Sequence, residues 1–365
     1  MRTVTSPRGR LTARTLATSV TPAAAVTLAA VMLLTGVTLS AVASLAGCGG
    51  PPASPSSDGL VSATPLSHPP PGASRTTGFV RFRFVRSWGG KGSAPGRFTM
   101  PKGVAVDADG FVYVADYGNA RVQKFTADGE LVTMWGGHGE ASGEFRGVSR
   151  VAVGGDGLVY VTDAKNHRVQ VFTSDGAFVR AWGREGSGPG EFDTPRGIAV
   201  APDGTVYVGD EKGGRIQRFT ADGRFLTAWG TWGGRPGRFR DVKDLAVGHD
   251  GRVYASDAGN ERVQVFTADG RLLAVIGGIG DGPGEFREPR GVAVNRRATL
   301  FVAEFRGQRI QEFSAAYEPL GFWGERGSGL GQFDGPRGIA FGPDGRLYVC
   351  DMGNHRIQCF APVTD

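Results

Sequence analysis

The sequence predicts an all-β chain whose folded part is a closed six-bladed β-propeller. Equivalent residue types recur every 47 positions, six times in succession, without an insertion, and self-similarity at a period of this size is typical of repeat architectures. Short runs rich in Val, Ile, Tyr and Phe alternate with glycine-containing turns, which indicates strands joined by tight connections. No long apolar run with a helical period occurs beyond the N-terminus.

The repeat is seen most clearly in rows of residues that keep the step of 47. Residues 84–365 number 282, which is six repeats. Four of the rows are Trp88, Trp135, Trp182, Trp229, Ile276 and Trp323; Phe98, Phe145, Phe192, Phe239, Phe286 and Phe333; Tyr113, Tyr160, Tyr207, Tyr254, Phe301 and Tyr348; and Arg121, Arg168, Arg215, Arg262, Arg309 and Arg356.

Each repeat contains four strand-like runs. In the first repeat these are 103–106, 111–115, 121–125 and 131–135, separated by turns that contain Asp, Asn and Gly. Four antiparallel strands in a repeat of this length make one propeller blade. The last repeat stops after its third run, and a spare run at 80–88 precedes the first blade. We therefore expect this N-terminal strand to close the last blade, because closure removes exposed sheet edges.

The N-terminus has the pattern of an export signal. Residues 1–22 are basic, and residues 23–47 are apolar and uncharged, the order found in secretory signals. The segment ends in Leu45-Ala46-Gly47-Cys48, which resembles the bacterial lipobox. The sequence thus predicts a lipoprotein signal peptide at 1–47, lipidation at Cys48 and an extracytoplasmic domain anchored to a bacterial membrane. An uncleaved membrane anchor is the alternative, since about 20 apolar residues can span a bilayer.

Residues 48–78 are rich in Pro, Ser, Gly and Thr, and such a segment buries too little apolar surface to fold alone. We interpret it as a disordered tether before the propeller at 79–365. Removing residues 1–47 leaves 37 basic and 35 acidic residues, a net charge of +2. Nucleic-acid-binding domains usually concentrate a much stronger positive field.

The pattern Gly-Ile-Ala-Val, Tyr-Val-x-Asp and Asn-x-Arg-[Val/Ile]-Gln-x-Phe, seen at 197–200, 207–210 and 354–360, resembles the NHL repeat. The resemblance covers all six repeats and implies a six-bladed propeller. Proteins with this repeat include RNA-binding and ubiquitin-ligase regulators of animals, an amidating lyase, and extracytoplasmic binding propellers of bacteria. Since one fold serves many functions, the resemblance leaves the activity open.

A row of carboxylates precedes the arginine row by five residues, at the two arms of one turn. Opposite charges this close should pair and satisfy backbone donors, so we expect structural ion pairs rather than catalytic acids. The expected pairs are Asp116 with Arg121, Asp163 with Arg168, Asp210 with Arg215, Asp257 with Arg262, Glu304 with Arg309, and Asp351 with Arg356.

A second row of charges lies at the start of each inner strand, where five of six residues are basic and the sixth is Ser149. These cations should surround one mouth of the channel, and converging like charges attract anions; a solvated rim is the alternative interpretation. Two repeats also replace a glycine next to this row. The candidate ligand-binding residues are Lys102, Arg150, Arg196, Lys243, Asp244, Arg290 and Arg337.

Two further residue types were considered as sites. Cys350 and Cys359 flank a turn in the last repeat, and either a disulfide, permitted outside the cytoplasm, or two buried thiols fit this placement. The inner strands contain no histidine, whereas the amidating lyase that the fold resembles holds zinc with inward-facing histidines. We therefore expect no metal, no cofactor and no catalytic residue.

The sequence favours a monomeric binding or scaffolding lipoprotein over an enzyme. Its partner would be a protein, an anionic glycan or an anionic small molecule. A lyase or hydrolase with a channel active site, and an RNA-binding domain, are the alternatives. Repeat 5 departs most from the pattern, at Ile276, 296–298 and Glu304, and could mark an interaction edge.

Overall fold

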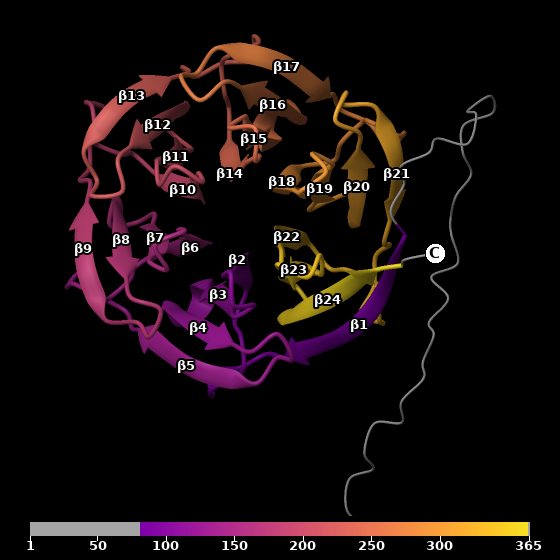
Figure 1. The fold of residues 1–365 in the computed structure, drawn as a ribbon, viewed down its shortest axis with the longest axis horizontal. Helices are drawn as coiled ribbons and strands as arrows, with labels where there is room; N and C mark the ends of the chain where they lie inside the picture. The colour runs from indigo at the N-terminus through magenta and orange to yellow at the C-terminus, as the bar shows by residue number, and fades with distance from the viewer. Residues whose placement is uncertain (1–80, 364–365) are drawn as a thin grey trace, which may run out of the picture. The chain divides into compact units, whose positions relative to one another are not determined.

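The computed structural model describes residues 81–363. Within them lie 24 β-strands and two short 3-10 helices, grouped into six four-stranded antiparallel sheets. The sheets are arranged as radial blades around a central axis, with the first strand of each blade innermost (Figure 1). The predicted all-β six-bladed propeller is confirmed. The predicted signal peptide, the lipidation site Cys48 and the tether at 48–78 lie outside the described residues.

Blades are numbered in chain order, and each is given from its inner to its outer strand. Blade 1 comprises β2 (Pro101–Val106), β3 (Val112–Asp116), β4 (Arg121–Phe125) and β5 (Leu131–Gly136). Blade 2 comprises β6 (Val148–Val153), β7 (Val159–Asp163), β8 (Arg168–Phe172) and β9 (Phe178–Trp182). Blade 3 comprises β10 (Pro195–Val200), β11 (Val206–Asp210), β12 (Arg215–Phe219) and β13 (Phe225–Trp229). Blade 4 comprises β14 (Val242–Val247), β15 (Val253–Asp257), β16 (Arg262–Phe266) and β17 (Leu272–Gly277). Blade 5 comprises β18 (Pro289–Val294), β19 (Leu300–Glu304), β20 (Arg309–Phe313) and β21 (Pro319–Trp323). Blade 6 comprises β22 (Pro336–Phe341), β23 (Leu347–Asp351), β24 (Arg356–Pro362) and β1 (Phe82–Gly89). The 3-10 helices are η1 (Tyr117–Asn119) and η2 (Ala258–Asn260).

The N-terminal strand closes the last blade, as the truncated final repeat predicted. Strand β1 pairs antiparallel with β24, from Phe82 opposite Pro362 to Gly89 opposite Arg356, with one irregularity near Phe84. Figure 1 shows the two strands side by side at the point where the ring closes. Both ends of the described chain are therefore held in one sheet.

The hydrophobic core lies between the faces of neighbouring blades. Each of six apolar clusters combines residues from two adjacent blades. The phenylalanine row that begins at Phe98 is completely buried. Trp135 of the outer strand β5 meets Tyr113 edge-on at 6.3 Å between ring centroids and covers Gly176 of the next blade, where an added Cβ would lie 2.6 Å from the indole. The repeated residues are thus the residues that join one blade to the next.

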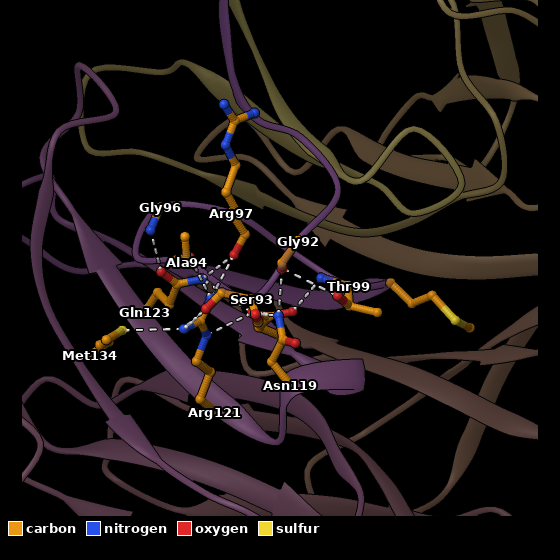
Figure 2. A network of polar contacts seen from close by, with 12 residues as sticks. Gly92, Ser93, Ala94, Gly96, Arg97, Thr99, Asn119, Arg121, Gln123 and Met134 are labelled. Atoms are coloured by element: carbon orange, nitrogen blue, oxygen red, sulfur yellow. Dashed lines mark hydrogen bonds and ion pairs between the residues drawn. The ribbon is translucent and has the colours of Figure 1, made fainter.

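The arginine row holds the loops that connect successive blades, as Figure 2 shows for blade 1. Arg121 donates to the backbone carbonyls of Ser93, Ala94 and Arg97 at 2.8–2.9 Å, and its Nε lies 2.9 Å from the buried carboxylate of Asp116. The other pairs are equally close: Asp163 and Arg168 at 3.2 Å, Asp210 and Arg215 at 3.3 Å, Asp257 and Arg262 at 2.8 Å, Glu304 and Arg309 at 2.5 Å, and Asp351 and Arg356 at 2.7 Å. All six expected ion pairs are therefore formed.

Candidate functional site at the mouth of the central channel

The candidate ligand-binding residues come together where the inner strands begin. Lys102, Arg196, Lys243, Arg290 and Arg337 are each the second residue of an inner strand. Inner strands surround the axis of the ring (Figure 1), so these side chains start from one end of the central channel. Three of the five are shielded from solvent, because Lys102, Lys243 and Arg337 are 6%, 8% and 9% exposed.

Arg150 and Asp244 replace the glycines that follow this row in the other four blades. Arg150 of β6 and Asp244 of β14 are both buried and form an ion pair of 3.0 Å. The guanidinium of Arg150 also donates to the backbone carbonyl of Lys102 in blade 1 and to that of Arg290 in blade 5 at 2.8 Å. The side chain of Arg150 therefore contacts three other blades of the ring.

Hydroxyl groups support these two residues in their own blades. The backbone N–H of Arg150 donates to Thr162 Oγ1 at 3.0 Å, and the N–H of Asp244 donates to Ser256 Oγ at 2.9 Å. The other blades have Ala115, Gly209, Ala303 and Cys350 at this position. The departure from glycine on the first strand is thus accompanied by a hydroxyl on the second strand.

Three carboxylates pair with cations of the row. Glu211, which follows β11, contacts both Arg196 and Lys243, the latter at 2.9 Å. Lys243 also pairs with Asp241 at 2.6 Å, and Arg290 pairs with Glu288. Arg306, on an exposed turn, contacts Glu288 as well at 2.9 Å.

Lys102 and Arg337 stand apart from these pairs. Within residues 81–363, neither forms an ion pair, and Nε of Arg337 is buried without a hydrogen-bond partner. The ammonium of Lys102 lies 2.9 Å from the ring centroid of Tyr117, and the guanidinium of Arg337 lies 5.0 Å from that of Phe305. Aromatic faces attract cations but do not replace a counter-ion.

Burial and nearby positive charge shift the titration of both groups. Burial first, and then the guanidiniums of Arg337, Arg196, Arg150 and Arg290, lower the pKa of Lys102 to about 5. Burial, and then the guanidiniums of Arg290, Arg150 and Arg196, lower the pKa of Arg337 to about 8, and the charge of Glu288 acts in the opposite direction. Strongly shifted groups in a charged cluster are candidates for function.

The sequence analysis missed Glu211, Tyr117 and Phe305. They belong to one row, directly after the carboxylate row, which reads Tyr117, Ala164, Glu211, Ala258, Phe305 and Met352. Because no residue type recurs at this position, comparing the repeats for shared residues does not identify it. Variation at one fixed position of a strict repeat was the available signal.

The disulfide considered between Cys350 and Cys359 is not formed, and both residues are free, buried thiols. The pairing of β23 with β24 sets Cys350 opposite Ile357 and Cys359 opposite Tyr348. The two cysteines are therefore diagonal rather than directly opposed. This arrangement agrees with the alternative of two small buried side chains.

Three histidines of the repeats, His167, His249 and His355, lie in turns, and His138 lies in the connection between blades 1 and 2. His355 accepts a hydrogen bond from the backbone N–H of Met100 at 3.0 Å, and His167 Nδ1 lies 2.6 Å from the carbonyl of Asp193. No group of three or more His, Cys, Asp or Glu side chains is placed to hold a metal ion within 81–363. In the same range, no helix is long and apolar enough to cross a membrane.

Comparisons with known proteins agree with the fold. A 6-bladed beta-propeller model matches residues 140–229 and 239–322, and an NHL repeat model matches 98–125 and 333–360. The protein is a six-bladed β-propeller, and two of its segments match the NHL repeat.

A short match links the chain to a human protein, the E3 ubiquitin-protein ligase TRIM32, at 48% identity over 48 residues. The match covers 13% of this chain and only 7% of the human protein.

Similar solved structures share the propeller fold. Virginiamycin B lyase from Staphylococcus aureus has a TM-score of 0.55 at 18% identity, covering 78% of this chain and 100% of its own. A Bacteroides thetaiotaomicron protein has a TM-score of 0.61 at 18% identity, covering 78% and 77%. A Xanthomonas campestris gluconolactonase has a TM-score of 0.56 at 15% identity, covering 78% and 91%. Identities this low show the fold alone.

Proposed function

We propose that this propeller is a binding protein that recognises an anionic group of a ligand or protein partner at the mouth of its channel. One observation carries the proposal: Lys102 and Arg337 are buried at the mouth, and no carboxylate within residues 81–363 pairs with them. Converging charges of one sign attract ions of the opposite charge. The cluster is also held rigidly, because Arg150 joins four blades beneath it.

A thermal-shift screen of the purified protein tests this function. The panel would contain anionic sugars, phosphates and cell-wall fragments, and a ligand at about 100 times its Kd should stabilise the protein by about 2.7 kcal/mol. Cross-linking on whole cells would search for a protein partner. Binding should be lost in Arg196→Gln/Arg290→Gln and kept in Arg296→Gln/Arg297→Gln, whose exposed arginines lie beyond the other end of β18. Binding that is equal in both variants, or absent in screen and cells alike, would refute the proposal.

We further propose that the propeller is displayed outside the cytoplasm on a lipid anchor. Support comes from the basic region 1–22, the apolar region 23–47 and the sequence Leu45-Ala46-Gly47-Cys48. Cys48→Ala should block lipid attachment and leave the precursor unprocessed. Intact-mass measurements that give the same unlipidated N-terminus for both proteins would contradict the anchor.

A lyase or hydrolase is the second candidate, and the amine of Lys102 favours it. A lysine with a pKa of about 5 is neutral near pH 7 and can accept a proton during a reaction. Every compound that binds in the screen should therefore be incubated with the protein and analysed for conversion. Conversion that is lost in Lys102→Met would establish an enzyme, whereas binding without conversion supports the leading function.

A further inference from the structure

We propose that Lys102 and Arg337 form a site for one doubly charged oxyanion, the phosphate group of a phosphate monoester. The inference rests on the proposed function and names the chemical group that the mouth recognises. It is argued from the burial of these two side chains, from the charge balance around them and from the rings that hold the neighbouring cations in place.

Burial without a counter-ion is the first observation. Lys102 and Arg337 are 6% and 9% exposed, and they extend from neighbouring inner strands, β2 and β22, at the closure of the ring. Removing an unpaired charge from water costs several kcal/mol, and partner charges must offset this cost. The other four cations have such partners, in Asp244, Glu211, Asp241 and Glu288. A bound anion would supply the same compensation for these two.

The charge that remains sets the valence of the ligand. With Arg150, Arg196, Lys243 and Arg290 each paired with a carboxylate, Lys102 and Arg337 are left over, and together they carry two positive charges when Lys102 is protonated. A phosphate monoester has a charge close to −2 at neutral pH. A single carboxylate would compensate Arg337 alone and would not restore the charged form of Lys102.

Aromatic rings hold the cations that would contact the ligand. The guanidiniums of Arg290 and Arg337 lie over the same ring, Phe305, at 4.1 and 5.0 Å from its centroid. Stacking fixes the orientation of a planar guanidinium, whose forked N–H groups suit phosphate oxygens. On the neighbouring blade, the face of the Tyr117 ring lies against the ammonium of Lys102. A bound phosphate would therefore contact the compact ammonium of Lys102 from blade 1 and the planar guanidinium of Arg337 from blade 6.

Ligand binding should also change the protonation of Lys102. The groups that act on it are the guanidiniums of Arg150, Arg196, Arg290 and Arg337, which lower its pKa to about 5, and the phenol ring of Tyr117. Carboxylates on the packed strands β3 and β23 are each held by the arginine of their own blade. Lys102 is therefore neutral near pH 7 without ligand, and a dianion beside it would restore the charged form.

Isothermal titration calorimetry of the purified protein tests the site directly. The probes are inorganic phosphate, glycerol 3-phosphate, sulfate and acetate. We expect the three dianions to bind and acetate to bind at least tenfold more weakly. Tighter binding of glycerol 3-phosphate than of inorganic phosphate would indicate a phosphate on a larger molecule, and the reverse order would indicate free phosphate. Either order supports the site.

Lys102→Met and Arg337→Met should each weaken phosphate and sulfate binding at least tenfold, with Arg297→Met as the matched control. Circular dichroism would confirm that each variant is folded. Equal affinity in Arg337→Met and in the unchanged protein would overturn the site, as would the absence of dianion binding. If dianions fail to bind while a partner still requires Arg196 and Arg290, only this inference fails and the proposed function survives.

Sulfate gives a readout that a purely structural role would not produce, because it remains doubly charged across the range of the experiment. Binding should take up about one proton, so the affinity for sulfate should fall by as much as about tenfold for each pH unit above about 5. Titrations in two buffers with different heats of ionisation measure the proton directly. An affinity that does not change with pH, with no proton taken up, would contradict the role of Lys102.

Discussion

Arg150 and Asp244 form an ion pair between the inner strands of blades 2 and 4, with Nε of Arg150 3.0 Å from Oδ1 of Asp244. Both side chains are buried, at 5% and 7% exposure. Burial raises the pKa of Asp244, while its arginine partner acts in the opposite direction. The pair links two blades that are not neighbours in the ring, at the strand positions that directly follow the cation row.

Removing one partner of this pair should be far more costly than removing both. Arg150→Gly leaves the carboxylate of Asp244 buried and unpaired, which costs about 3–5 kcal/mol. Asp244→Gly leaves the opposite charge unpaired at a similar cost. Arg150→Gly/Asp244→Gly restores the glycine found in the other four blades and should be destabilised by less than either single variant. Urea unfolding of the unchanged protein and the three variants measures the coupling energy between the two residues. Additive changes in the free energy of unfolding would show that the residues are not coupled.

In the outer strand of blade 4, a smaller residue stands where the other blades have a large one, and the residue that packs against it is larger than its counterparts. The outer strands of the other five blades have Trp at this position, and Trp88, Trp135, Trp182 and Trp229 each cover a glycine of the next blade. Blade 4 has Ile276 instead, and Tyr317 stands at the glycine position. Tyr317 has a positive φ of 67°, and its ring meets Tyr254 edge-on at 6.4 Å, much as Trp135 meets Tyr113 at 6.3 Å. The tyrosine thus occupies the place of the absent indole.

This exchange predicts a second double-mutant cycle. Ile276→Trp should force two large rings into one space and destabilise the protein by about 1–3 kcal/mol. Tyr317→Gly should leave a cavity and also lose the hydrogen bond that Arg252 donates to its hydroxyl at 2.8 Å, at a cost of about 3–5 kcal/mol. The double variant restores the common pair and should recover most of the stability. A Tm for the double variant at or below both single variants would contradict the exchange.

The fold was predictable because each blade repeats the same contacts. Phe98, Tyr113 and Arg121 keep their step of 47 residues because every blade packs on the next in the same way. The step of 47 does not show which blades meet across the axis, so the partnership of Arg150 with Asp244 could not be read from the two replaced glycines. Ile276 was recognised as a departure, but its compensation by Tyr317, 41 residues later, became evident only from the packing.

The closing strand provides a third prediction. Trp88 of β1 meets Phe125 of blade 1 at 5.9 Å and Tyr348 of its own blade at 6.1 Å between ring centroids. Trp88→Ala should therefore destabilise the protein by about 3–5 kcal/mol. A chain that begins at Lys91 lacks β1 altogether and should melt at a still lower temperature, because it also exposes the edge of β24. A chain that begins at Gly78 is the control, and equal Tm values for all three would refute the role of β1.

The cysteines of the last blade should behave as inert thiols. Both are completely buried, and burial raises the pKa of Cys350 far above its ordinary value and that of Cys359 to about 11. Reaction with a thiol reagent needs the thiolate and access to it. In a Cys48→Ala background, the native protein should react very slowly, and the denatured protein should show two free thiols without a reducing agent. A denatured protein without free thiols would establish the disulfide instead.

Lys102 should make the stability of the protein depend on pH. Its pKa is about 5 in the folded protein against an ordinary 10.5, so between these values the unfolded chain binds one proton that the folded chain lacks. Between these two pKa values, the free energy of unfolding therefore rises with pH, by up to about 1.4 kcal/mol for each pH unit. Lys102→Met removes the effect, and its advantage in Tm should grow as the pH is lowered from about 9 towards 6 in buffers without phosphate or sulfate. Parallel stability curves for the two proteins would show that Lys102 remains protonated, and an advantage that disappears when sulfate is added would show that a dianion replaces the missing counter-ion.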